Sequence, residues 1–520
     1  MSILFSRQPA LSLGALLVVW ALFMSGCDTP KPAASENDKP VTNVPRGDGP
    51  GRFWAVDSND ADAGNAVDFD SFSVAKDKEK NVKWKADLGS EAFGGPAIAD
   101  GRIFVGTNNN KPRDPKIKGD KGVLMCFKES DGTFLWQIVH NKLENQTLDA
   151  PVCGIASRPA VDGDRLYYVS NRCELICADV NGDPDNPGKG KIIWSLDMIE
   201  ELKVYPGGLS GGLANCSPLV LDDLVYVITS NGASMETQKV PYPEAPSFLA
   251  VDKTSGKPVW QSDLPGKAIM DGQWGSPVAA EVNGKKQVIF PGGDGWIYGF
   301  EAKSGDLLWK FDCNPKNSSY KKKTRNYLVA TPVVHDGKVY IGVGREPDEG
   351  TGIGHFWCVD LTKTPKNKDK DLSPVDNKFD PKDPVNKDSG LVWHFGGDAP
   401  EGSELPYYFG RTVSTVAIHD GLVYATDLDG FLYCLDAKTG EKYWSHDLSS
   451  GTWSSPQYVN GKVYIGITNG TGDLFMFTAG KQKKDPIKIE TGEPLKVPVV
   501  AAHGVLYLNR GDALFAIAPK

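Results

Sequence analysis

One phrase recurs eight times along the chain and decides what it can fold into. Each copy starts with small residues, usually followed by Pro. It continues through an apolar strand, an Asp-Gly or Asn-Gly turn, a Val-Tyr strand and an aromatic strand, and most copies then close on Gly and Trp. The copies are Phe93–Val139, Ala156–Leu196, Asn215–Leu264, Trp274–Phe311, Val329–Phe395, Arg411–Leu448, Trp453–Ile489 and the shorter Val497–Ala518. Short strands joined by tight turns and repeated at this spacing predict the four-stranded blades of a β-propeller.

The last copy lacks the strand that ends in Trp. A segment that matches it, Val82–Leu88, lies near the N-terminus and shares a Trp-x-x-Asp pattern with the copies ending at Trp194 and Trp260. We therefore expect this strand to pair with the last copy and close the ring, which leaves no exposed sheet edge between the first and last blades. The predicted fold is all-β: a single eight-bladed propeller over residues 80–520, closed by an N-terminal strand in the C-terminal blade.

A tryptophan stands near the end of each blade. A large flat ring at this position is expected to pack between neighbouring blades, so we interpret these residues as structural rather than ligand-binding. With the closing strand included, the set is Trp84, Trp136, Trp194, Trp260, Trp309, Trp393 and Trp444.

The first 79 residues have the pattern of an exported, anchored protein. An apolar run, Leu11–Met24, is short for a membrane span and ends in Ser-Gly before Cys27. Residues 1–26 are predicted to be a lipoprotein signal peptide, and Cys27 the lipidated N-terminus of the mature protein. The alternative is an ordinary signal peptide with a chance cysteine. Residues 27–79 are polar and Pro-rich and predict a disordered tether, with the protein on the periplasmic side of a bacterial membrane.

The net charge argues against one class of binding partner, and the cysteine content leaves disulfide bonds possible. The net charge is -9 and the pI about 5.4, so nucleic acid is not expected as a partner. Nothing in the sequence calls for an oligomer, and we expect a monomer. Apart from Cys27, the chain has Cys153, Cys173, Cys216 and Cys313 as possible disulfide partners with no assigned connectivity.

Phrases such as GWIYGFEAKSGDLLW and GFLYCLDAKTGEKYW resemble pyrroloquinoline-quinone (PQQ) repeats. The resemblance covers nearly everything after residue 80. That family contains quinoprotein dehydrogenases as well as non-enzymatic scaffolds, and one lipid-anchored, eight-bladed member serves the machine that assembles outer-membrane β-barrels. The resemblance therefore implies the fold and leaves both functions open.

Marks of the dehydrogenase branch are missing. The sequence has no two adjacent cysteines, no Cys-x-x-Cys-His and no match to that branch's calcium ligands, so we expect no cofactor and no catalytic residues. PQQ with calcium is the alternative. One loop places oxygen side chains at alternate positions as calcium loops do, without completing the pattern. Its candidate ligands are Asp179, Asn181, Asp183 and Asp185.

The favoured hypothesis is a lipid-anchored periplasmic scaffold that binds envelope proteins or peptides, in outer-membrane assembly if it acts as that family member does. The alternatives are a PQQ-dependent dehydrogenase that oxidises an alcohol or sugar, and a sensor of a small ligand. Two insertions, Asn108–Gly122 and Lys363–Asp388, predict surface loops. Long loops on a propeller often carry recognition, but a run of alternating charges is more often simply solvated. The candidate binding residues stand at blade starts and are expected to face the channel: Arg158, Asn215, Trp274, Arg411 and Trp453.

Overall fold

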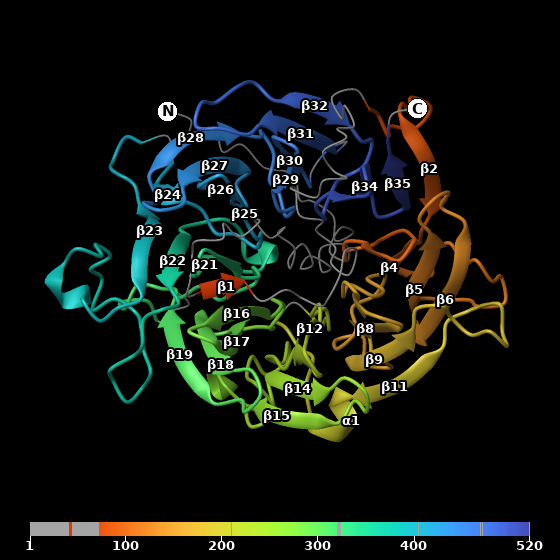
Figure 1. Ribbon diagram of the computed structural model, residues 1–520, viewed down its shortest axis with the longest axis horizontal. Coiled ribbons are helices and arrows are strands. Elements are labelled where there is room, and N and C mark those ends of the chain that lie inside the picture. Colours follow the sequence, from red (N-terminus) through yellow and green to blue (C-terminus); the bar gives the residue numbers. More distant parts are fainter. Residues whose placement is uncertain are drawn as a thin grey trace, which may run out of the picture.

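The computed structural model describes residues 41–43, 72–209, 211–319, 324–403, 405–468, 470 and 472–518. They form eight four-stranded antiparallel blades arranged in a ring around a central axis, seen end-on in Figure 1. This confirms the predicted eight-bladed propeller. Cys27 and most of the predicted tether lie outside the described residues.

Each blade runs outward from the axis in four strands. Blade 1 comprises β3 (Ala97–Ala99), β4 (Arg102–Asn108), β5 (Lys121–Lys128) and β6 (Phe134–Asn141), and blade 2 comprises β7 (Ala160–Asp162), β8 (Arg165–Val169), β9 (Glu174–Asp179) and β11 (Ile192–Asp197). Blade 3 comprises β12 (Leu219–Leu221), β13 (Leu224–Ile228), β14 (Phe248–Asp252) and β15 (Pro258–Ser262), and blade 4 comprises β16 (Val278–Val282), β17 (Lys285–Pro291), β18 (Trp296–Glu301) and β19 (Leu307–Asp312).

Blades 5 to 8 follow the same plan. Blade 5 comprises β20 (Val333–His335), β21 (Lys338–Val343), β22 (His355–Asp360) and β23 (Leu391–Asp398), and blade 6 comprises β25 (Ala417–His419), β26 (Leu422–Thr426), β27 (Phe431–Asp436) and β28 (Lys442–Asp447). Blade 7 comprises β29 (Gln457–Val459), β30 (Lys462–Gly466), β31 (Asp473–Thr478) and β32 (Ile487–Glu490), and blade 8 comprises β33 (Val500–Ala502), β34 (Val505–Asn509), β35 (Ala513–Ile517) and β2 (Val82–Asp87).

The N-terminal strand closes the ring as predicted. In Figure 1, β2 lies beside β35 although the two are at opposite ends of the chain. They pair antiparallel, with Trp84 opposite Ala516. Phe72 and Val74, upstream of the predicted domain start at residue 80, are buried with side chains of blades 7 and 8. The packed structure therefore begins at least as early as Phe72.

The blade tryptophans lie where neighbouring blades meet. Six of the seven indole N–H groups donate to a backbone carbonyl of the next blade at 2.8 to 3.2 Å, from Trp84, Trp136, Trp194, Trp260, Trp393 and Trp444. Trp309 instead donates to Oε1 of Gln287 in its own blade, while its ring packs among blade 5 residues. Each ring thus buries apolar area at a blade interface, and most also add a hydrogen bond across it.

Turn glycines make this close packing possible. Gly440 has a φ of 73° and lies so close to the ring of Trp393 that a Cβ added to this glycine would be 2.7 Å from the ring. Gly305 meets Trp260 in the same way, with a φ of 74°. A residue with a side chain would be strained by the backbone angle and would also collide with the indole.

Short extra elements lie on several blades. β1 (Val41–Asn43) pairs antiparallel with the innermost strand β16, β10 (Gly188–Lys189) pairs parallel with the outer strand β6, and β24 (Tyr407–Phe409) pairs with the outer strand β23. The rest are the helix α1 (Met198–Leu202) and the 3-10 turns η2 (Gly266–Ala268), η3 (Pro347–Glu349) and η4 (Pro384–Asn386). No helix in the described part of the chain has both the length and the apolar character to cross a membrane.

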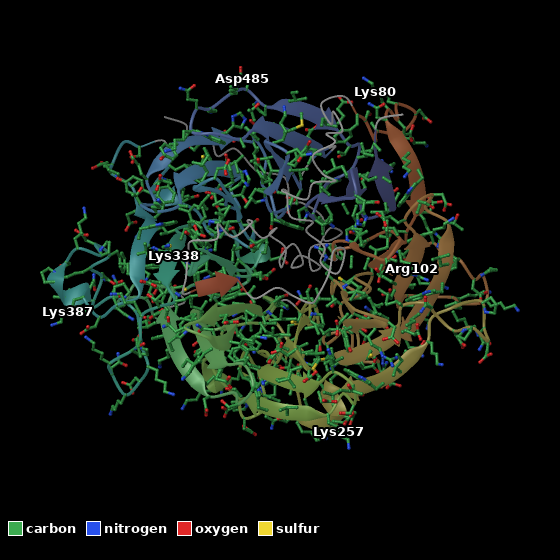
Figure 2. The ribbon with its side chains drawn as sticks, in the orientation of Figure 1. Lys80, Arg102, Lys257, Lys338, Lys387 and Asp485 are labelled. Carbon is green, nitrogen blue, oxygen red and sulfur yellow. The ribbon has the colours of Figure 1, made fainter. Side chains whose placement is uncertain are left out.

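The predicted insertion Lys363–Asp388 is partly built into the fold. Asp371 forms a parallel bridge with Lys310 of β19, and Leu372 is fully buried against blades 4 and 5. The segment therefore covers part of the outer edge of blade 4, which limits pairing of that edge with other chains. Its remainder stands out from the ring near the labelled Lys387 in Figure 2.

The two faces of the ring differ in their loops. Because strands alternate in direction within each blade, the links between second and third strands lie on the same face as the links between blades. This face carries the long segments 109–120, 229–247 and 344–354. We call it the loop face. The opposite face carries mainly tight turns, such as Asp420-Gly421 with φ values of 47° and 72°, together with the long link 361–390 of blade 5.

Candidate functional site

Eight side chains occupy one equivalent position, four residues before the innermost strand of each blade. Five of them form a single buried cluster with Trp453 packed against it, although they come from different blades. Equivalent positions on different blades can meet in this way only near the axis. We call the set the channel ring: Phe93, Ala156, Asn215, Trp274, Val329, Val413, Trp453 and Lys496.

Three of the five predicted binding residues, Asn215, Trp274 and Trp453, belong to the channel ring. Arg158 and Arg411 stand two residues away from the ring position in their blades. The blade-start pattern in the sequence therefore located the axis but did not fix which residue of each start faces it.

Arg158 belongs to a belt of hydrogen bonds that links the blades. Its N–H donates to Oγ of Ser217, whose N–H donates to Oγ of Ser276, whose N–H donates to Oγ1 of Thr331, at 3.0 to 3.1 Å. Thr415 and Ser455 are joined in the same manner. The Arg158 side chain is 4% exposed and donates to Pro96 O. These contacts explain why hydroxyl residues recur before the prolines at the blade starts. They also show that Arg158 helps to hold neighbouring blades together.

Arg411 lies at the loop face and holds segment 344–354. Its guanidinium donates to the backbone carbonyls of Glu349, Gly350 and Thr351. Burial, and then the nearby charge of Arg345, lower its pKa. Its contacts within the described residues thus position a loop of blade 5.

Asn215 is the polar exception in the apolar part of the channel ring. Its side chain is fully buried, and neither amide atom has a hydrogen-bond partner within the described residues. A buried amide without partners is costly and therefore uncommon in folded proteins.

A buried carboxylate that the sequence reasoning missed lies beside Trp274. Asp271 accepts hydrogen bonds from Leu209 N at 2.6 Å and from the hydroxyl of Tyr327 at 2.8 Å, and Tyr327 contacts the Trp274 ring. The Tyr327 hydroxyl in turn accepts from Glu346 N. These bonds tie together the loops of blades 3, 4 and 5.

Burial controls the protonation of this group. It raises the pKa of Asp271 to about 6 and, with the neighbouring carboxylates Asp348 and Asp271, that of Glu346 to about 9. The tripeptide Asp271-Gly272-Gln273 matches no known catalytic or binding motif. Only the folded structure therefore reveals that Asp271, Tyr327 and Glu346 lie together.

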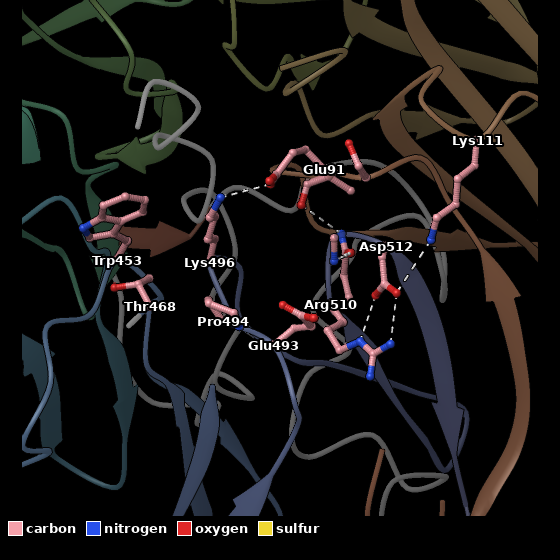
Figure 3. A pocket seen from close by; sticks show the side chains of 13 residues that line it. Glu91, Lys111, Trp453, Thr468, Glu493, Pro494, Lys496, Arg510 and Asp512 are labelled. Carbon is pink, nitrogen blue, oxygen red and sulfur yellow. Dashed lines mark hydrogen bonds and ion pairs between the residues drawn. The ribbon is translucent and has the colours of Figure 1, made fainter. Parts of the chain in front are cut away.

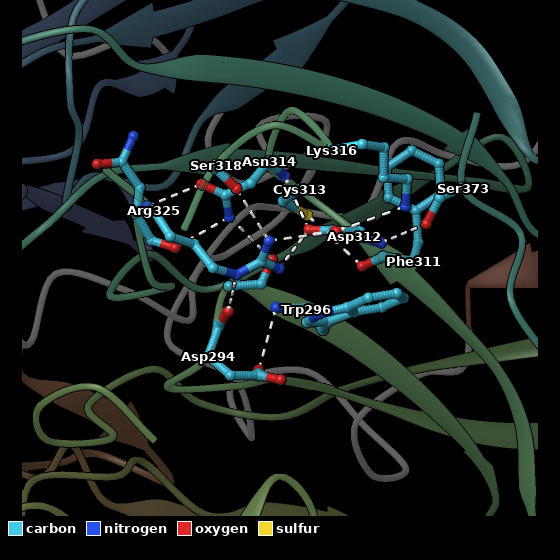
Figure 4. Close-up of polar contacts among 12 residues, drawn as sticks. Asp294, Trp296, Phe311, Asp312, Cys313, Asn314, Lys316, Ser318, Arg325 and Ser373 are labelled. Carbon is cyan, nitrogen blue, oxygen red and sulfur yellow. Dashed lines mark hydrogen bonds and ion pairs between the residues drawn. The ribbon is translucent and has the colours of Figure 1, made fainter. Parts of the chain in front are cut away.

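A second buried charged group supports the link from blade 4 to blade 5. Figure 4 shows the Arg325 guanidinium between Asp312 and Asp294. It forms an ion pair with Asp312, both side chains being 4% exposed, and donates to Asp294 O at 2.7 Å. Lys316 also reaches Asp312 and lies over the Trp296 ring. The mutual neutralisation of these charges makes the group a structural anchor for the loop.

The four candidate calcium ligands do not converge on one point. Asn181 Oδ1 accepts a 2.6 Å bond from Arg102, while Asp183 bonds Asn186 and the N–H of Asp185. Asp179 accepts bonds from Asn181. Across the described ranges, no three His, Cys, Asp or Glu side chains gather in a way that could hold a metal ion.

The eight cysteines of the described chain are buried, and no two of them are joined. This includes all four residues that the sequence left as possible disulfide partners, and each is fully or nearly fully buried: Cys153, Cys173, Cys216 and Cys313.

A pocket of about 400 Å³ opens at the seam where blade 8 meets blades 1 and 7. Two channel-ring residues, Trp453 and Lys496, form part of its wall (Figure 3). Lys496 forms a 3.0 Å ion pair with Glu91 of blade 1, and Arg510 forms one with Asp512 at 2.8 Å. The seam pocket is therefore pre-organised by ion pairs on the closing side of the ring.

Comparison with known proteins agrees with this fold. Residues 119–368 and 383–482 match the model of the family described as outer membrane protein assembly factor BamB. The structure of BamB from Moraxella catarrhalis superposes with a TM-score of 0.51 at 16% identity, covering 82% of this chain and 94% of that one. A europium-containing methanol dehydrogenase gives 0.51 at 13% identity, covering 84% and 93%. At these identities the likeness concerns the fold.

Curated relatives with sequence similarity include quinoprotein alcohol dehydrogenases. The quinoprotein alcohol dehydrogenase PedE of Pseudomonas putida is 26% identical over 329 residues, 57% of this chain and 44% of PedE. The dehydrogenase subunit of a quinone alcohol dehydrogenase of Gluconacetobacter polyoxogenes is 31% identical over 164 residues, 31% of this chain and 19% of that protein. The chain spans less than half of the length of either relative. Its match to the family model covers well over half of the chain, and the protein therefore belongs to the PQQ-repeat β-propeller family of the outer membrane protein assembly factor BamB.

Proposed function

We propose that the protein is a scaffold that binds envelope proteins or peptides through its loop face, in the assembly of outer-membrane or other envelope proteins. In this proposal Cys27 carries the lipid that holds the propeller on the periplasmic side of a bacterial membrane. Membership of the BamB family supports the proposal.

One observation about the loop face carries the proposal. Four large apolar side chains there are 38 to 47% exposed: Met235, Tyr242, Ile353 and Tyr408. They stand on segments 229–247 and 344–354 and on β24, and the last two meet in a bridge between Ile353 and Gly410, the residue after β24. Exposed aromatic and aliphatic side chains on pre-organised loops are typical of protein-binding surfaces.

Site-specific photo-crosslinking in the intact envelope tests this proposal. A photoreactive phenylalanine at Tyr242 or Tyr408 should yield discrete crosslinks to envelope proteins. Val259 is the matched control, because it is 50% exposed but stands on the outer strand β15. If Tyr242 and Tyr408 gave no crosslinks, or the same ones as Val259, the loop face would not be the binding surface.

The second candidate is a PQQ-dependent dehydrogenase, which the curated relatives favour. The channel does not fit a flat quinone at Trp274. That ring is 1% exposed and lies so close to the backbone that a Cβ added at Gly272 would be 2.2 Å from it. Calorimetric titration with PQQ and calcium, followed by dye reduction with alcohols and sugars, distinguishes the two candidates. Micromolar binding with dye reduction would replace the scaffold by an enzyme.

A further inference from the structure

Among the described residues, one charged side chain of the seam pocket has no charged partner. Three cations, Lys111, Lys496 and Arg510, and three carboxylates, Glu91, Glu493 and Asp512, line it, so its formal charge is zero. Lys496 pairs with Glu91, and Arg510 and Lys111 pair with Asp512 at 2.8 and 3.8 Å. Glu493 is exposed, and its carboxylate makes no ion pair or hydrogen bond within the described residues.

The pocket also has an aromatic wall. The indole of Trp453 stands at one end, and Pro494 and Glu493 lie away from it toward Arg510 and Asp512 (Figure 3). Trp453 is half-buried and borders the pocket, whereas Trp274 is closed. The volume suits a short segment of chain or a small molecule.

We propose that the seam pocket binds a short peptide segment in which an aromatic residue stands near a lysine or arginine. The aromatic side chain packs on Trp453, and the cation pairs with Glu493. Since every cation of the pocket already has a carboxylate partner, a ligand with several negative charges is disfavoured, and this includes PQQ with its three carboxylates. This inference rests on the proposed scaffold function and assigns it a binding site and a ligand class.

The test is calorimetric titration of the full-length chain in detergent with acetyl-Phe-Gly-Lys-amide and acetyl-Phe-Gly-Glu-amide. The lysine peptide should bind about ten-fold more tightly than the glutamate peptide. Glu493→Gln should remove most of that preference. Glu490→Gln is the matched control, since it makes the same charge change three residues away on the outer strand β32, where Glu490 is 68% exposed and pairs with Lys78. It should keep the preference.

Trp453→Ala should weaken both peptides by about ten-fold while leaving the lysine preference intact. Glu493→Gln alters an exposed group that makes no ion pair in the described part of the chain, so it keeps the proposal falsifiable if the tryptophan variant fails to fold. Equal binding of the two peptides, an unchanged preference in Glu493→Gln, or displacement of the peptide by PQQ would each overturn the assignment. If the peptides fail while crosslinks at Tyr242 and Tyr408 persist, only the pocket is lost and the scaffold function stands.

Discussion

At the scale of single residues, the blade tryptophans combine burial with a specific hydrogen bond. Trp393 is 3% exposed, and its Nε1 donates to Ala437 O at 3.0 Å in the next blade. Trp393→Phe should lower the free energy of unfolding by about 1–2 kcal/mol, since the indole hydrogen bond is lost and Ala437 O keeps the Tyr340 hydroxyl as its remaining donor among the described residues. Trp393→Ala should cost about 3–5 kcal/mol because it also leaves a cavity. Denaturant unfolding followed by circular dichroism measures both changes.

The control for Trp393 is Trp296→Phe. Trp296 is half-buried, and its indole N–H makes no hydrogen bond among the described residues, so this variant should change stability by less than about 1 kcal/mol. Equal losses in the two Trp→Phe variants would show that the hydrogen bond across the blade interface contributes nothing.

A buried carboxyl in blade 6 should make stability depend on pH. Burial raises the pKa of Asp427 to about 6. The folded protein therefore holds this proton more tightly than the unfolded chain, whose aspartates titrate near 3.9. The stabilisation is fully present below about pH 4 and is lost as the pH rises through 6.

Asp427→Asn isolates this effect, because the amide does not titrate. The destabilisation caused by the substitution should be larger at pH 5 than at pH 8, by about 1–2 kcal/mol. Unfolding of both proteins at the two pH values gives the difference, and histidines shared by the two proteins cancel. A destabilisation that is independent of pH would mean that the carboxyl has its ordinary pKa.

At the scale of elements, the closing strand holds the ring together. β2 supplies the outermost strand of blade 8, and Phe72 and Val74 ahead of it are buried. A propeller beginning at residue 72 should unfold in one cooperative transition. One beginning at residue 80 should be less stable by about 2–5 kcal/mol, since two apolar side chains are lost. One beginning at residue 89 exposes the edge of β35 and should aggregate.

These truncations are compared by thermal unfolding and size-exclusion chromatography. A chain that begins at residue 89 and remains monomeric with an unchanged transition would contradict the closure described here. Since all three chains share the other seven blades, any difference among them arises at the seam.

Two kinds of element show which parts of the fold could be predicted from the sequence and which could not. The turns with Asp420-Gly421 and Gly440 were predictable because positive φ values select particular residues. The role of segment 363–388 was not, because its alternating charges hide Leu372, whose burial depends on the neighbouring blade 4. The local composition of a segment predicts its average exposure to solvent. The burial of a single side chain depends instead on the residues that pack against it in the folded structure.

At the scale of the whole molecule, the proposed lipid anchor at Cys27 is separable from the fold. Cys27→Ser should leave the propeller folded and move the protein from the membrane fraction to the soluble periplasmic fraction. Fractionation with mass spectrometry of the mature N-terminus measures this, and a conservative change elsewhere in the tether, Thr29→Ser, is the control. A Cys27→Ser protein that stays in the membrane fraction with an unchanged mass would rule out lipid attachment at this cysteine.

The sequence by itself determined the blade number, the ring closure and the place of the axis. All three follow from a repeat whose turns, strand periodicity and terminal Trp are local properties of the chain. It predicted Trp453 and Asn215 at the axis, because blade starts are equivalent by rotation.

Only the tertiary structure decided what those positions do. Arg158 proved to be part of an interblade belt, Trp274 to be closed over by glycine backbone, and Asp271 to be a buried carboxylate between three blades. The seam pocket joins Glu91 to Lys496, about 400 residues apart in the sequence. Such contacts depend on how eight similar blades differ where they meet, and a repeat describes only what the blades share.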